Sequence, residues 1–181
     1  MNPLKKWSAP ALTIALLAVC AGIFYWYTSR TMVLDPAKLT PAETVESCPG
    51  AELSLTISGT DMALTFSNHS DARLESGAAV GGDRNFYFTG GLQVLLDDQW
   101  YVMPSEAYST AGVGLELQPG DSVSGPYDLT PYGDLPDGAY RIAFDYRQRS
   151  PSADDPLMHH PYHQSYARFD VETGRYVIPN S

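Results

Sequence analysis

The chain has 181 residues, of which 44% are hydrophobic and 18% are charged, and this length suits one ordinary domain with an accessory segment. Its 21 acidic and 11 basic side chains give a net charge of −10, which argues against a nucleic-acid partner because phosphate binding needs clustered Lys and Arg. The 14 Pro, 15 Gly and 12% aromatic residues favour an all-β domain.

The first predicted element is an uncharged stretch from Ala9 to Tyr27, which lies between Lys6 and Arg30. As a helix it would be about 28 Å long, close to the ~30 Å hydrocarbon core of a bilayer. Aromatic residues lie at both of its ends, as in the interfacial belts of membrane helices. We expect a cytoplasmic N-terminus over residues 1–8, a transmembrane signal-anchor helix over 9–29 and a C-terminal domain outside the cytoplasm.

Two processing alternatives stay open for this segment. An apolar run of this kind is also found in cleaved signal peptides, although no pair of small residues marks a cleavage site before the aromatic run. The residues before Cys20 resemble the lipobox of bacterial lipoproteins, but Val19 replaces the small residue of that motif. We expect Cys20 to lie in the bilayer, which leaves Cys48 as a free thiol or as one half of an intermolecular bridge.

Residues 30–50 contain three prolines and no sustained hydrophobic period, and they predict a stalk between the membrane and the domain. Apolar and polar residues then alternate over 53–58 and again over 62–67, which predicts two strands joined by a turn at Gly59. The stretch 72–85 is less regular, with at most a short edge strand.

The second half of the chain predicts further short strands. Residues 92–96 and 100–103 flank a polar loop and read as a hairpin. Strands follow at 115–117, at 123–129 with Pro126 favouring a sheet edge, at 139–146 and at 165–171. Seven or eight short strands at this spacing predict a β-sandwich over residues 51–178.

The segments LQVLLDDQWYVMP, LELQPGD and YGDLPDGAYRI resemble the immunoglobulin-like domains of exported and membrane-anchored bacterial proteins. The resemblance implies an immunoglobulin-like antiparallel β-sandwich with a role in adhesion, sensing or spacing. Within it we expect Trp100 to fill the space between the sheets and Gly120 to form a turn. Gly138 precedes Tyr140, which would act as a tyrosine corner by bonding the backbone with its hydroxyl.

One candidate metal site lies in the loop before the last strand. His159, His160 and His163 lie close to Asp154 and Asp155, and imidazoles bind zinc or copper. A short His-rich tract is also typical of an exposed polar loop, which is the alternative. We expect no other cofactor. The carboxylate pairs at 97–98 and 134/137 lack the spacing of a calcium loop and fit turns.

The tyrosines suggest a recognition surface, because eight of them exceed what one small core can hold and exposed Tyr is enriched at interfaces. They are Tyr87, Tyr101, Tyr108, Tyr127, Tyr132, Tyr162, Tyr166 and Tyr176. A protein or glycan partner would bind there. The alternative is that these tyrosines are scattered over the strand edges.

The sequence therefore predicts a membrane-anchored, cell-surface module that binds, senses or spaces and catalyses no reaction. Two alternatives remain. The chain is an accessory subunit of a membrane complex, or it is a membrane-tethered metal-dependent hydrolase that uses the His-rich loop.

Overall fold

The structure is a computed structural model that describes residues 13–14, 16–22, 34–80, 86–106, 111–149 and 162–179. The chain divides into two compact units, residues 1–32 and 33–181. In the first unit, residues 13–14 and 16–22 are helical and their large apolar side chains are exposed. Over the described residues we find no helix with the length and hydropathy needed to span a bilayer. The rest of the predicted 9–29 anchor lies outside those residues.

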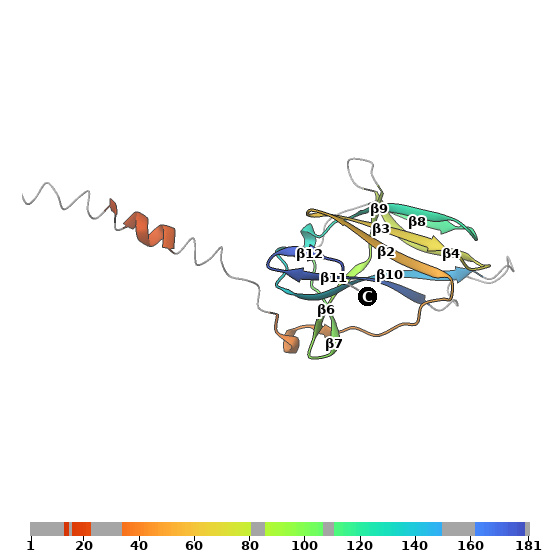
Figure 1. Ribbon diagram of the computed structural model, residues 1–181, viewed down its shortest axis with the longest axis horizontal. Helices are drawn as coiled ribbons and strands as arrows, with labels where there is room; N and C mark the ends of the chain where they lie inside the picture. Colours follow the sequence, from red (N-terminus) through yellow and green to blue (C-terminus); the bar gives the residue numbers. More distant parts are fainter. Residues whose placement is uncertain are drawn as a thin grey trace, which may run out of the picture. The chain divides into compact units, whose positions relative to one another are not determined.

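The second unit is built from two antiparallel sheets, which confirms the all-β prediction. The larger sheet, here sheet A, has the path β1 (Thr40–Pro41), β7 (Gln99–Val102), β6 (Gly91–Leu96), β10 (Gly138–Arg149), β11 (Tyr162–Glu172) and β12 (Arg175–Val177). Strand β4 (Arg73–Val80) also pairs with β10, and it carries β5 (Phe86–Phe88) and β8 (Ala111–Leu117). Sheet B has the order β2 (Ala51–Ser58), β3 (Asp61–Asn68) and β9 (Ser122–Tyr127). Figure 1 shows β2, β3 and β9 together beside the long strands β10 and β11.

The hydrophobic core lies between the two sheets because side chains alternate across each strand. On β10, the side chains of Tyr140, Ile142, Phe144 and Tyr146 are almost completely buried. Phe66 of β3 meets this row, with its ring centroid 4.9 Å from that of Phe144. The opposite face of β10 is the outer face of sheet A, and it carries the polar residues considered below.

Several predicted strands are confirmed. Strands β2 and β3 pair over their whole length, and β6 and β7 form the expected hairpin. Pro126 lies on β9, which is an edge strand of sheet B. The structure adds the eight-residue strand β4 where the sequence predicted at most a short edge strand, and β4 pairs with three other strands.

The predicted stalk over residues 30–50 is wrong for the part that the structure describes. Residues 34–50 belong to the second unit: a 3-10 turn η2 (Pro36–Lys38) precedes β1, and β1 extends the edge of sheet A at β7. Leu34 and Leu39 pack against the core. In Figure 1 this segment, in orange, continues from β1 to the start of β2. Its prolines are compatible with this position because an edge strand needs few backbone donors.

Candidate functional site

A group of cationic and aromatic side chains occupies the outer face of sheet A where β6, β10 and β11 run side by side. Arg141 of β10 lies directly between Gln93 of β6 and Arg168 of β11 in the strand register. Trp100 of β7 and Tyr166 of β11 flank the arginine side chain. We call these five residues the outer-face cluster.

Arg141 is held tightly within the cluster. Its guanidinium carbon lies 4.4 Å from the centroid of the Trp100 ring and 4.0 Å from that of Tyr166. Its Nε donates a hydrogen bond of 2.6 Å to Oε1 of Gln93. The side chain is therefore stacked between two aromatic walls, and cation–π attraction replaces part of its lost hydration. Only 4% of the residue is exposed.

The positive charges of Arg141 and Arg168 are not neutralised within the cluster. Nη2 of Arg141 is enclosed and has no hydrogen-bond partner. Arg168 is exposed, and its guanidinium carbon lies 5.6 Å from the centroid of the same Trp100 ring. Among the described residues, no carboxylate forms an ion pair with either arginine. Burial lowers the pKa of Arg141, Tyr166 opposes that shift and the charge of Arg168 adds to it.

A second arginine group on the same face is neutralised. Glu75 of β4 accepts hydrogen bonds from Arg73 at 2.8 Å and from Arg149 of β10 at 2.7 Å. Glu116 of β8 pairs with Arg73 at 3.0 Å. We call these four residues the ion-pair network. It shows that the outer face of sheet A supplies acids to some of its arginines and not to others.

The segment after β1 runs from one wall of the cluster to the other. The amide of Ala42 donates to the carbonyl oxygen of Trp100 at 2.8 Å. Three residues later, the amide of Val45 donates to the Tyr166 hydroxyl at 3.1 Å. Residues 42–45 therefore join the backbone of Trp100 to the hydroxyl of Tyr166, the two residues whose rings enclose Arg141. We call residues 42–47 the strap.

The position of Trp100 corrects a prediction. Trp100 was expected to fill the space between the sheets, but it is half-buried and its ring contacts Arg141 on the outer face. The next residue, Tyr101, packs against the core instead. Successive side chains of a strand point to opposite faces, so only one of the two aromatic residues can face inward.

The other residues of the predicted scaffold lie as follows. The hydroxyl of Tyr140 donates to the carbonyl oxygen of Pro136 at 2.8 Å, four residues upstream. Burial, with a smaller effect from Asp137, raises the pKa of Tyr140 to about 12. Gly138 is the first residue of β10. Gly120 has φ of 87° in the turn before β9, a conformation that favours glycine.

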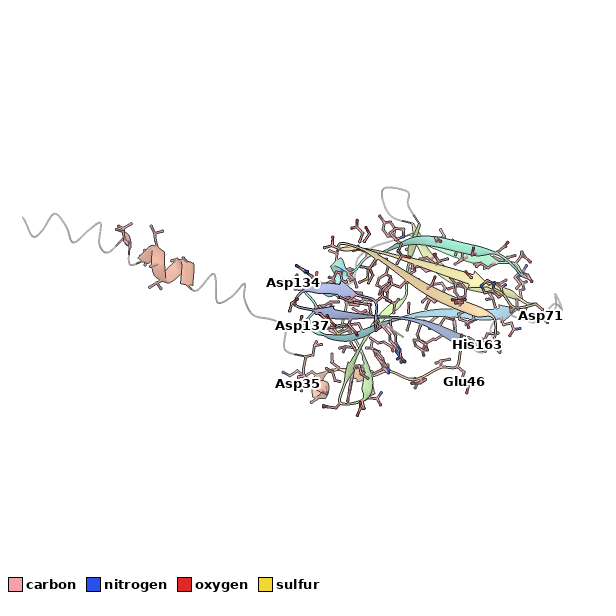
Figure 2. The ribbon with its side chains drawn as sticks, viewed as in Figure 1. Asp35, Glu46, Asp71, Asp134, Asp137 and His163 are labelled. Atoms are coloured by element: carbon pink, nitrogen blue, oxygen red, sulfur yellow. The ribbon has the colours of Figure 1, made fainter. Side chains whose placement is uncertain are left out.

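The predicted metal site is only partly within the described residues, because His159 and His160 lie outside them. His163 is near the start of β11, where its ring stacks on Tyr146 with a centroid separation of 5.8 Å. Its Nδ1 lies 3.3 Å from the carbonyl oxygen of Glu46 in the strap, and Figure 2 shows these two residues side by side. No group of three His, Cys, Asp or Glu side chains in the described part of the chain could hold a metal ion.

The predicted tyrosine surface is divided between two environments. Tyr127 is buried, and Tyr101, Tyr132 and Tyr176 pack against the core. Tyr162 and Tyr166 lie on the outer face, where their rings stack on Arg147 and Arg141. Tyr87 is half-buried, and Tyr108 lies outside the described residues.

The two cysteines are not bridged. Cys48 is buried at the end of the strap, with its Sγ 3.3 Å from Oε1 of Gln148. Burial, with a smaller effect from Asp71, raises the pKa of its thiol. The thiol is therefore protonated at neutral pH and a poor nucleophile.

Carboxylates in the turns have local structural contacts. Oδ1 of Asp137 accepts a hydrogen bond from the amide of Gly174, and Oδ1 of Asp128 accepts one from the amide of Thr130. Figure 2 shows Asp134 and Asp137 at the end of the sandwich opposite Asp71.

No family model matches the sequence, and no curated protein is significantly similar to it. The resemblance to bacterial immunoglobulin-like domains therefore stays a prediction. The outer-face cluster was not predicted as a site, although the alternation over 139–146 correctly placed Arg141 on the face opposite Tyr140. Chemically, the cluster offers positive charge, hydrogen-bond donors and an aromatic surface, which suit binding.

Proposed function

We propose that the protein is a membrane-anchored, extracytoplasmic module that binds a ligand through the outer face of sheet A and catalyses no reaction. The observation that carries this proposal is the outer-face cluster, in which two arginines directly opposite each other have no acidic partner among the described residues. Like charges in this position destabilise a sheet. Binding of a negatively charged ligand would compensate these two charges and stabilise the folded protein.

The apolar sequence from Ala9 to Tyr27 supports the membrane anchor, and the β-sandwich supports a binding role because such scaffolds present wide, rigid faces. The resemblance to immunoglobulin-like domains favours an extracytoplasmic location. An accessory subunit of a membrane complex would use the same face, with a neighbouring subunit as its ligand.

Site-specific photo-crosslinking in intact cells tests the proposal. A photoreactive residue is placed at Val102, whose side chain is exposed on the outer face, and as a control at Ser54, which is exposed on sheet B. We expect a discrete adduct from position 102 that is absent from position 54. The adduct should disappear when Arg168→Gln is added. Equal labelling from both positions, or none from position 102, would refute binding through this face.

The anchor is tested separately with right-side-out membrane vesicles. External protease should degrade residues after about 33 and leave an N-terminal fragment in the membrane pellet. A chain that resists protease until detergent is added would place the domain on the other side. A chain extracted by alkaline carbonate would refute the anchor.

A further inference from the structure

We propose that the ligand of the outer-face cluster carries a carboxylate, which is held by Arg168 and Arg141 with its apolar part against the Trp100 ring. This inference rests on the proposed binding function and specifies its chemistry. The charges are unevenly compensated: Glu75 and Glu116 neutralise Arg73 and Arg149, but no acid in the described part of the chain pairs with Arg141 or Arg168. Asp170, two residues further along β11, forms no ion pair with Arg168.

The enclosed nitrogen Nη2 of Arg141 can accommodate an anionic oxygen. Nη2 of Arg141 is buried without a hydrogen-bond acceptor, whereas Nε of the same side chain has Gln93. A buried donor that lacks a partner lowers stability, and the effect is larger for a charged group. An anionic oxygen at Nη2 would remove this deficit. The arginine is held in place by Trp100, Tyr166 and Gln93, so little side-chain freedom is lost when the ligand binds.

The chemistry of the cluster favours a carboxylate over other anions. A guanidinium presents parallel N–H donors whose spacing matches the two oxygens of a carboxylate. The net charge of −10 repels polyanions and multiply charged phosphates at long range, and it penalises a single carboxylate less. The half-buried Trp100 ring adds a flat surface for the uncharged part of the ligand.

A ligand reaches Arg141 from the side of Arg168. Arg168 is exposed and forms the entrance, whereas Arg141 is buried between the rings of Trp100 and Tyr166. The strap bonds to Trp100 and Tyr166 through Ala42 and Val45, and its last residues are held by further hydrogen bonds of Glu46 and Ser47. A carboxylate that reaches Nη2 of Arg141 therefore changes the surroundings of Trp100.

Trp100 fluorescence tests this inference directly. Trp7 and Trp26 are the other two tryptophans, so the full chain with Trp7→Phe and Trp26→Phe, in detergent micelles, reports on Trp100 alone. One probe is a tetrapeptide with a free C-terminal carboxylate, compared with its C-terminal amide. Another is galacturonate, which carries a single carboxylate, compared with its methyl ester. Inorganic phosphate is the competing anion.

We expect a saturable change in Trp100 emission with a carboxylate probe and none with its neutral counterpart. The probe that saturates identifies the source as a peptide end or an acidic sugar. Arg168→Gln should weaken binding by about tenfold or more, as the loss of a charge-assisted hydrogen bond does. Arg73→Gln removes the same charge from the ion-pair network and should leave the affinity within about twofold.

Three results would overturn the carboxylate assignment. They are saturation by phosphate at lower concentration than by either carboxylate, equal binding of the neutral counterparts, and unchanged affinity in Arg168→Gln. Absence of any saturation together with a position-102 adduct in cells would reject the carboxylate and leave the binding function standing. Absence of both would reject the two proposals together.

Discussion

Two arginine groups share the outer face of sheet A but are stabilised in different ways. In the ion-pair network, Glu75 accepts from Arg73 and Arg149, so the charges are compensated within the chain. In the outer-face cluster, Arg141 and Arg168 have aromatic rings and one amide oxygen as neighbours, and no described carboxylate pairs with them. The outer-face cluster is therefore stabilised mainly by stacking, which leaves its positive charge available to a ligand.

The largest expected effect comes from removing Gln93, the one hydrogen-bond acceptor of Arg141 among the described residues. Gln93→Leu leaves Nε of the guanidinium without that acceptor and should lower the free energy of unfolding by about 1–3 kcal/mol, measured by urea denaturation. The double variant Gln93→Leu/Arg141→Met removes both polar groups and should recover most of that loss. A double variant as unstable as Gln93→Leu would show that Arg141 stabilises the fold through other contacts.

A smaller effect is expected when the ion-pair network loses its central acid. Glu75→Gln should lower the free energy of unfolding by about 1 kcal/mol, because the site is partly exposed and solvent screens the pairs. The difference should shrink in ~1 M salt. Glu172→Gln, an exposed acid on β11 with no ion pair in the described residues, is the control and should be neutral. A loss independent of salt would contradict the electrostatic account.

The wall that holds the strap is tested with Tyr166→Phe. The substitution keeps the ring beside Arg141 but removes the hydroxyl that accepts from Val45, and it should lower the free energy of unfolding by about 1 kcal/mol or less. Hydrogen exchange at the Val45 amide should accelerate by a larger factor than global unfolding explains. Tyr162→Phe, on an exposed tyrosine of the same strand, should not change that exchange.

The smallest effect has the opposite sign. Arg168→Gln removes a charge directly opposite Arg141 and should raise the free energy of unfolding by a few tenths of a kcal/mol. Thermal unfolding at low ionic strength measures it, and salt should abolish the gain. Arg175→Gln on β12 lies opposite Glu172 and should bring no gain. A loss of stability in Arg168→Gln would mean that Arg168 is already compensated in the folded protein.

The strand pattern was largely predictable because residues such as Leu53, Leu64 and Ile142 alternate with polar ones. Strand β4 was not, since its residues 76–79 are small or polar and give little contrast between two faces. The resemblance to immunoglobulin-like domains placed Trp100 between the sheets, but Tyr101 faces inward instead, and composition alone does not show which of two neighbouring aromatic residues points inward.

The outer-face cluster depends on strand register. Arg141 and Arg168 meet only because β10 and β11 pair so that these two residues are opposite, and a long connection separates the strands in the sequence. Gln93 comes from β6 and Trp100 from β7, so the cluster draws on four strands. Local periodicity predicts which face a side chain takes, but not which residue of another strand lies beside it.

The strap gives the domain a defined point at which it yields to tension. The strap and the residues before it, 34–47, are the first described part of the second unit. They are attached by the two-residue strand β1, by Leu34 and Leu39 against the core, and by hydrogen bonds to Trp100, Tyr166 and other residues of sheet A. A force applied from the N-terminal side therefore acts on these contacts before it reaches β2. Their loss would free the Tyr166 hydroxyl while the pairing of β10 with β11 is kept.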